Sequence, residues 1–208
     1  RREGARVAYI DLDAHHGDGV QTIFYDASDV LTISLHESGR YLFPGTGHSY
    51  ELGKGAGRGW SLNVPLEPFS ADASYLEVFD ILVPDAIAAF EPDVIVLQAG
   101  ADTHTLDPLA DLSLSLHGMR ASYERVVELA DSFAGGRLLV TGGGGYAAFQ
   151  VPPRAWAHAW SVMTGRRLPD LLPEAWRERW RARAGEPMPE RAFDAPADPL
   201  SSARRHEV

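Results

Sequence analysis

The chain has 208 residues, of which 45% are hydrophobic and 23% are charged. This composition is typical of a globular protein of one large or two small domains, and it excludes a disordered one. The net charge of −10 argues against a nucleic-acid partner, which requires a basic face. The absence of cysteine excludes disulfides and thiolate metal sites. Because the sequence shows neither a membrane span nor a signal peptide, we expect a cytoplasmic protein with no membrane partner.

The chain alternates between short apolar runs typical of buried strands and longer amphipathic stretches typical of helices. The predicted strands, in chain order, are Val7–Asp11, Val30–Leu35, Val94–Gln98 and Arg137–Thr141. The predicted helices are Asp18–Tyr25, Ser70–Phe90, Leu116–Phe133, Pro152–Thr164 and Trp176–Arg183. A glycine-rich stretch over residues 38–59 predicts a long loop. Strands that alternate with helices favour an α/β fold with a parallel sheet.

The composition changes after Pro169. We therefore expect residues 1–168 to form one folded unit and residues 169–208 to form an extension that is partly helical or disordered. From Gly185 onward the chain is rich in Pro, Ala, Arg and Glu, which predicts a poorly ordered tail.

Three polar or glycine-rich segments follow predicted strands, at the sheet edge where α/β proteins bind ligands. The first contains Asp11, Asp13 and His15. Residues two apart in an extended chain point the same way, so these three side chains are expected on one side. Two carboxylates so placed need a cation, and Asp with His suits zinc or another divalent first-row metal. The alternative is a polar loop in which the aspartates cap the next helix.

The second segment contributes Asp102, which alone could simply cap a helix. If it lies at the same edge as Asp13 and His15, the three make a site with an open coordination position, typical of catalytic zinc. His104 is interpreted as a loop side chain rather than a fourth ligand.

The third segment is a run of four glycines before Tyr146. Such a run lets the backbone approach a ligand closely. A phosphate-binding loop is not favoured, because no Lys-Ser/Thr pair follows. Alternatively, Tyr146 packs in the core.

Four segments together resemble the histone deacetylase family, and most closely its bacterial acetoin-utilisation branch. The segments are YIDLDAHHGDGVQTIFY, VLTISLHESGRYLFPGTG, VIVLQAGADTHTLDPL and LLVTGGGGY, within about residues 7 to 165. The resemblance implies a three-layer arginase/deacetylase-like α/β fold with a central parallel sheet and helices on both faces. It also implies that residues 1–168 are the C-terminal portion of the catalytic domain.

Carried over by position, the resemblance implies that zinc is bound by Asp13, His15 and Asp102, a ligand set that also suits iron(II). Tyr146 would be the catalytic tyrosine, with Asp11 and Asp18 as carboxylates that orient catalytic histidines. The substrate-binding residues implied are Gly144, beside the scissile amide, and Phe43 and Leu109, along the acyl-lysine tunnel.

The family also has a monovalent cation, usually potassium, beside the zinc. Its implied ligands are the side chains of Asp11 and Ser34 and the backbone of Asp13, His15 and Leu35. A second such site would use the backbone of Phe24, Val30 and Trp60, although the family more often has tyrosine at the last position.

The implied reaction is zinc-dependent hydrolysis of acetyl-lysine in a protein to lysine and acetate, with acetylated polyamines as an alternative substrate. In the family a His-His pair some tens of residues before the DxDxH strand supplies the base and acid. Only ten residues precede Asp11 here, and none is histidine. We therefore expect a chain that binds metal but deacetylates slowly or not at all, the alternative being an inactive ligand-binding fragment.

An arginase-like ureohydrolase is the other enzyme class considered. Such an enzyme binds two manganese ions and needs further paired carboxylates, which the segment LQAGA before Asp102 does not supply. The sequence indicates no oligomeric state.

Overall fold

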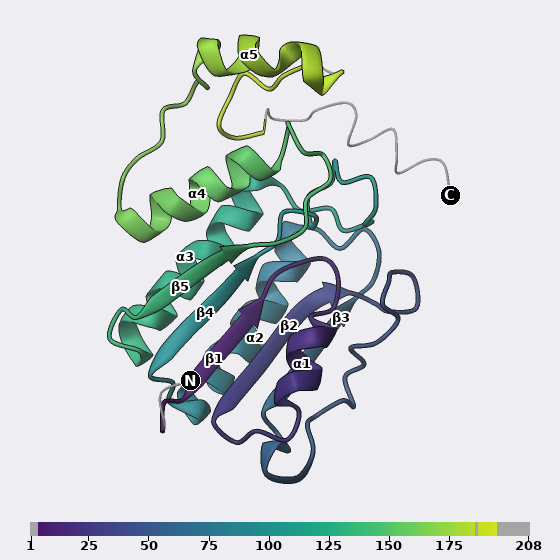
Figure 1. Ribbon diagram of the computed structural model, residues 1–208, viewed down its shortest axis with the longest axis vertical. Coiled ribbons are helices and arrows are strands. Elements are labelled where there is room, and N and C mark those ends of the chain that lie inside the picture. The colour runs from purple at the N-terminus through teal and green to yellow at the C-terminus, as the bar shows by residue number, and fades with distance from the viewer. Residues whose placement is uncertain (1–3, 186, 195–208) are drawn as a thin grey trace.

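The structure is a computed structural model that describes residues 4–185 and 187–194 (Figure 1). Its centre is a five-stranded parallel sheet with the strand order β3-β2-β1-β4-β5. The strands are β1 (Val7–Asp11), β2 (Val30–Glu37), β3 (Ser61–Leu66), β4 (Val94–Ala99) and β5 (Leu138–Gly142). The helices are α1 (Asp18–Phe24), α2 (Asp72–Phe90), α3 (Leu116–Phe133), α4 (Pro152–Thr164) and α5 (Glu174–Ala184), with a short 3₁₀ helix at Gly55–Gly57.

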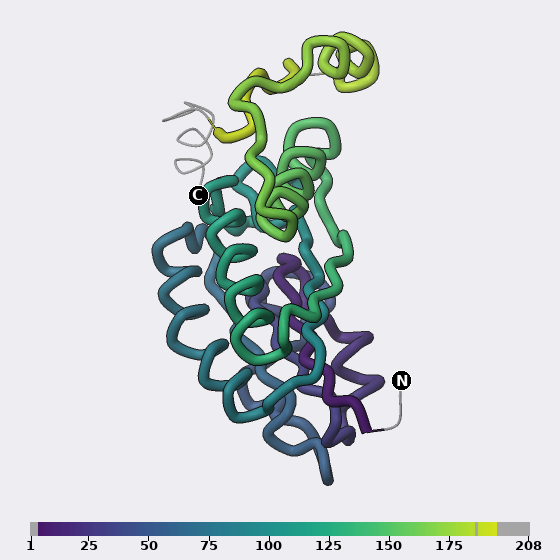
Figure 2. The backbone as a smooth tube through the Cα atoms, turned by 90° about the vertical axis from the view of Figure 1, so that its left-hand side faces the viewer, coloured from purple at the N-terminus to yellow at the C-terminus, as the bar shows by residue number. Residues whose placement is uncertain are grey.

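Helices lie on both faces of the sheet, which confirms the predicted three-layer α/β fold. Figure 1 shows α2 and α3 behind the sheet and α1 in front of β2. Figure 2, from the side, shows the helices α2 and α3 running along one face of the molecule. In the part of the chain that the structure describes, no helix is long and apolar enough to cross a membrane.

The strand β3 was absent from the sequence prediction. Its sequence SLNVPL is short, contains Pro65 and follows the glycine-rich loop, so it carries a weak strand signal. Pairing with β2 nevertheless holds it at the sheet edge, where a missing backbone N–H is tolerated. The strand is therefore determined by its neighbour more than by its own sequence.

The main core lies between the sheet and α2. Residues at a spacing of three or four face inward along α2, including Phe79, Val83 and Ile87, which are completely buried. They pack in one cluster with strand residues such as Ile10 and Leu97. The spacing follows from the 3.6-residue helical period, which places such residues on one face.

Part of the predicted tail is docked on the domain, so for Pro187–Asp194 the prediction of poor order was wrong. Ala192 is buried, and its N–H donates to the Asp170 carbonyl. The carboxylate of Asp194 accepts hydrogen bonds from the His104 ring, the Leu116 N–H and the Arg154 guanidinium. Composition could not reveal this docking, since it depends on one carboxylate meeting three donors. The rest of the predicted tail, residues 195–208, lies outside the described residues.

We expect Phe79→Ala to lower the free energy of unfolding by about 3–5 kcal/mol, because it leaves a cavity in a closed core. Ile81→Ala, on the same helix but 61% exposed, should change it by less than about 0.5 kcal/mol. Urea unfolding followed by circular dichroism measures both. Equal losses would contradict this description of the core.

We expect Asp194→Asn to lower the free energy of unfolding at pH 7 by about 2 kcal/mol. Burial disfavours the charged form of Asp194, but its hydrogen bonds with His104 and Leu116 outweigh this effect. These contacts and the nearby Arg154 lower the pKa of Asp194 to about 2 from the usual 3.8. A lowered carboxyl pKa stabilises the folded state at pH values above the usual pKa of 3.8. This stabilisation is lost as the pH falls from about 4 to about 2. Urea unfolding should therefore show a smaller difference in free energy of unfolding between the unmodified chain and Asp194→Asn at pH 3 than at pH 6. An equal difference at both pH values would contradict the stabilising role of the Asp194 carboxylate.

Candidate metal centre

Three segments converge at the carboxyl ends of β1, β4 and β5. Asp13 and His15 follow β1, and Asp102 follows β4. Their ligand atoms all lie within 4.8 Å of one another, and this is the only such acidic or imidazole group found among the described residues. The chain runs from β1 outward to β3 on one side of the sheet and continues through β4 on the other. The cluster therefore lies at the topological switch point, where open α/β sheets bind ligands.

The carboxylate of Asp13 is anchored through one oxygen and presents the other to His15. Its Oδ2 accepts hydrogen bonds from the Gln98 side chain at 2.9 Å and from the Gly144 N–H at 2.6 Å. Its Oδ1 lies 3.2 Å from His15 Nδ1. Partners of this kind orient a ligand before a metal binds.

Asp102 is anchored in the same way. Its Oδ1 accepts the Ala14 N–H at 2.8 Å, and its Oδ2 lies 2.9 Å from His15 Nδ1. The Nδ1 atom of His15 thus faces both carboxylates at once. One nitrogen and two carboxylate oxygens around one point match the donor types of a zinc site and leave a coordination position open.

The pKa shifts in the cluster indicate that it favours a bound positive charge. Hydrogen bonds to Asp102 and Asp13 raise the pKa of His15 to about 10. Burial raises the pKa of Asp102 to about 6, while the bond from His15 acts against it. Burial acts in the same direction on Asp13, but hydrogen bonds from His15 and Gln98 outweigh it and hold its pKa well below the usual value. Two buried carboxylates of this kind are stable together only with a positive charge beside them.

Gly144 lies where only glycine fits. A Cβ at this position would overlap the carboxylate of Asp102, so any larger residue would displace a candidate ligand. Its carbonyl accepts the Ala101 N–H at 2.7 Å, and its own N–H holds Asp13. Backbone hydrogen bonds therefore connect the glycine run after β5 to the Asp13 carboxylate and to the Ala101 N–H, next to Asp102.

Tyr146 lies at the edge of this cluster and not in the core. Its side chain is 48% exposed, and its ring lies edge-on to His15 with 6.1 Å between centroids. Burial and the carboxylates of Asp102 and Asp13 raise the pKa of Tyr146, so its hydroxyl keeps its proton at neutral pH. The Tyr146 N–H donates to the buried carboxylate of Asp107, which also accepts the Leu109 N–H.

Asp11 is not one of the three clustered ligands. The strand ends at Asp11, and the chain turns so that Asp11 Oδ1 accepts the Asp13 N–H. The other oxygen accepts the Tyr9 hydroxyl at 2.8 Å. Asp18 is exposed at the start of α1, where its Oδ1 accepts the Gly19 N–H.

The residues implied for a monovalent cation lie around Asp11. Asp11 and Ser34 are Cα partners on β1 and β2. Burial raises the pKa of Asp11 to about 7. A buried carboxylate of this kind is stabilised by a nearby cation, so the donor set of Asp11 and Ser34 fits one. For the second implied site, the Trp60 carbonyl already accepts the Thr32 N–H, and the Phe24 carbonyl accepts the Ala27 N–H.

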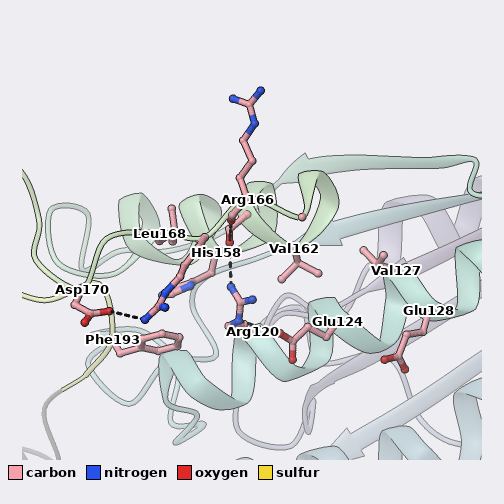
Figure 3. Close-up of a pocket in the computed structure, with 13 residues that line it drawn as sticks. Arg120, Glu124, Val127, Glu128, His158, Val162, Arg166, Leu168, Asp170 and Phe193 are labelled. Atoms are coloured by element: carbon pink, nitrogen blue, oxygen red, sulfur yellow. Dashed lines mark hydrogen bonds and ion pairs between the residues drawn. The ribbon is translucent and has the colours of Figure 1, made fainter.

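The residues implied for the substrate tunnel are at the surface. Phe43 and Leu109 are both strongly exposed. A cavity of about 650 Å³ lies elsewhere, between α3, α4 and the loop that follows α4 (Figure 3). Arg120, His158 and Asp170 line it, and none of the predicted site residues does.

Sequence reasoning missed the supporting residues. Gln98 and Asp107 lie within the segments that carried the resemblance, but nothing in their spacing indicated which atoms they would hold. Both ring nitrogens of His104 are engaged, one by the Leu106 N–H and the other by Asp194. This agrees with its interpretation as a loop side chain.

Comparison with known proteins identifies the family to which this chain is similar. Residues 1–163 match the histone deacetylase domain. The chain is 50% identical over 169 residues to the acetoin utilization protein AcuC of Bacillus subtilis, covering 79% of this chain and 43% of that protein. It is 41% identical over 204 residues to AcuC of Staphylococcus aureus, covering 98% and 52%.

Solved structures of relatives have the same fold. A histone deacetylase homologue complexed with SAHA superimposes with a TM-score of 0.82 at 31% identity, covering 97% of this chain and 56% of that one. A homologue from Aquifex aeolicus gives 0.81 at 32% identity, with the same coverage. The chain spans about half the length of the relatives it matches. It belongs to the histone deacetylase domain family, in its AcuC-like branch.

Proposed function

We propose that this chain is the metal-binding portion of a zinc-dependent deacetylase that releases acetate from acetyl-lysine side chains. The observation that carries the proposal is the convergence of Asp13, His15 and Asp102, with Tyr146 at its edge. The family membership supports the reaction class. The resemblance of the sequence to the acetoin-utilisation branch favours a metabolic protein over histones as the substrate.

Zinc would be held by Nδ1 of His15 and one oxygen each of Asp13 and Asp102. When bound, it would polarise the acetyl carbonyl and make a bound water more acidic. Iron(II) is the alternative, because two carboxylates make a harder ligand set than three histidines. One cluster of three ligands favours one divalent ion for each chain and disfavours the arginase-like alternative, which needs two.

The contribution of the chain itself comes from Tyr146 and its supports. The Tyr146 hydroxyl keeps its proton and can donate it as a hydrogen bond to the oxygen on which negative charge develops. The Asp107 carboxylate fixes the Tyr146 backbone at 2.8 Å. Because four flexible glycines precede Tyr146, this external anchor limits where the ring can lie. Asp11 beside Ser34 would hold potassium, as a structural ion.

The cluster offers no free general base. The ring of His15 faces the two carboxylates, and His16 points elsewhere, with its Nδ1 2.8 Å from the Thr46 hydroxyl and its ring against His36. We therefore propose that the chain binds metal and that its turnover is slow. Asp11 and Asp18 are retained in this proposal as carboxylates that orient a base and acid from another segment.

The substrate is proposed from the chemistry of the site and from one relative. A solved homologue was complexed with SAHA. Exposed Phe43 and Leu109 would contact the chain of an acyl-lysine. Acetylated polyamines are the alternative substrate, and both are acetylated amines. We expect the protein to work in the cytoplasm without nucleic-acid or membrane partners.

We expect the chain to bind one zinc ion, measured by calorimetry and by metal analysis of the dialysed complex. Asp102→Asn should weaken zinc binding at least about 100-fold, since losing even an outer partner of a metal ligand costs about 10–100-fold. Asp85→Asn, at an exposed position on α2, is the matched control and should bind as the unmodified chain does. Two ions for each chain would contradict the assignment and favour an arginase-like site.

We expect Tyr146→Phe to lower the turnover of an acetyl-lysine peptide about 10²–10³-fold without changing zinc affinity, because it removes one donor to the developing oxyanion. Tyr25→Phe, outside the cluster, serves as control. The assay uses the zinc-loaded chain at concentrations that make a slow rate measurable, with an acetylated polyamine as second substrate. An unchanged rate in Tyr146→Phe would remove the tyrosine from the mechanism, and rapid turnover by the unmodified chain would contradict the expected impairment.

A further inference from the structure

The segment at residues 187–194, which follows α5, returns to the domain and is held by two helices. The ring of Phe193 stacks on the ring of His117 at the start of α3, with 4.2 Å between the ring centroids. It lies equally close to the ring of His158 on α4 (Figure 3). His158 Nε2 also donates to the Ala192 carbonyl at 2.9 Å. These contacts give the next side chain, that of Asp194, a defined position.

The Asp194 carboxylate divides its contacts between its two oxygens. Its Oδ2 lies 3.1 Å from His104 Nε2 and accepts the Leu116 N–H at 2.7 Å, while its Oδ1 accepts a hydrogen bond from Arg154. The side chain of His104 is buried, so water does not compete for this contact. The contact therefore joins the docked segment to a residue two positions after the candidate ligand Asp102.

This contact selects one tautomer of the His104 ring. The other ring nitrogen, Nδ1, lies 3.1 Å from the Leu106 N–H, which can only donate, so Nδ1 accepts and carries no proton. In the neutral ring the proton is then on Nε2, where the Asp194 carboxylate accepts it. The hydrogen bond made by one ring nitrogen sets the state of the other. Without Asp194, the ring loses the partner that favours the tautomer needed by Leu106.

His104 in turn shapes the turn that presents Asp107. Its carbonyl accepts the Asp107 N–H at 2.8 Å, while its ring accepts the Leu106 N–H. The buried Asp107 carboxylate accepts the Leu109 N–H through one oxygen and the Tyr146 N–H through the other. A shift of the turn therefore moves the anchor of Tyr146, and the four glycines before Tyr146 cannot compensate for its loss.

We propose that Asp194 is a positioning residue for the candidate site and acts on Tyr146 through His104 and Asp107. The proposal rests on the proposed function, in which the Tyr146 hydroxyl donates to the developing oxyanion. A misplacement of about 1 Å at a reacting group can cost about 100-fold in rate, so a distant support of this kind affects the reaction. Asp194 lies outside residues 1–163, which match the histone deacetylase domain. The support therefore comes from the C-terminal extension.

Zinc binding should not depend on this link. The Asp102 carboxylate is held by the Ala14 N–H at 2.8 Å, and the neighbouring Ala101 N–H donates to the Gly144 carbonyl. Both supports come from other segments and remain without Asp194. We therefore expect Asp194→Ala to bind zinc as the unmodified chain does, in contrast to Asp102→Asn.

The first test is amide hydrogen exchange, followed by NMR, at Tyr146 and Leu109, whose N–H groups are held by Asp107. Asp194→Ala should speed exchange at both positions at least about tenfold, the effect of about one hydrogen bond on a local opening equilibrium. Asp194→Asn keeps a side-chain oxygen for His104. Exchange in this variant should therefore stay close to that of the unmodified chain, although the variant is less stable.

The matched control is Asp72→Ala. The Asp72 carboxylate also holds the start of α3, where it accepts hydrogen bonds from the N–H and the hydroxyl of Ser115. Its loss should lower the free energy of unfolding without faster exchange at Tyr146, because the link through His104 remains. Unchanged exchange in Asp194→Ala, or an equal rise in Asp72→Ala or Asp194→Asn, would overturn the proposal.

The second test is ¹⁵N NMR of the His104 ring in the unmodified chain, which needs no variant to fold. We expect a protonated Nε2 and an unprotonated Nδ1, and a proton on Nδ1 would overturn the proposal. Neither NMR test requires turnover, so a failure of the proposed function is distinguishable from a failure of this inference.

The third test separates positioning from stability by turnover of the zinc-loaded chain. Asp194→Ala should lower kcat about tenfold or more, as a misplaced reacting group does. It should have no further effect in a chain that already carries Tyr146→Phe, because the hydroxyl that Asp194 positions is then missing. An equal loss in both backgrounds would show a merely structural role and overturn the proposal.

Discussion

The contact on which the rest of the site depends is that of His15 Nδ1 with the carboxylates of Asp13 and Asp102. Two carboxylates removed from water repel each other, and each loses solvation, so the arrangement is stable only with positive charge between them. In the protein alone the proton on His15 supplies that charge. A divalent ion would take the same place. The N–H donors of Gln98 and Gly144 then keep Asp13 oriented whichever cation is present.

The sheet topology makes this contact possible. The strands β1 and β4 are neighbours in the sheet although about 80 residues separate them in the chain. Their carboxyl ends open at the switch point, which brings Asp102 beside the loop after β1. The third segment can approach only because Gly144 has no side chain. The strand order thus brings together residues that are far apart in the chain. The absence of a Cβ at Gly144 leaves room for the three charged groups around one point.

Most of the fold could be predicted from the sequence, because the buried strands and long helices carry strong periodic signals. The helix Leu116–Phe133 was predicted with its observed bounds, while β3 was missed because pairing with β2 holds it. The cluster of Asp13, His15 and Asp102 was also predicted. What the sequence could not show is which partners hold the cluster, since Gln98 anchors Asp13 through a contact that no local pattern specifies.

The metal cluster is supported directly by the sheet, and this links the stability of the fold to the chemistry of the site. Asp11, Gln98 and Thr141 lie in register across β1, β4 and β5, directly beyond the row of Tyr9, Val96 and Leu139. Gln98 is therefore both a paired residue of β4 and an anchor of Asp13. Hydrogen bonds strengthen as the local dielectric falls, so the partly buried bond from Gln98 to Asp13 helps to hold this candidate ligand in place.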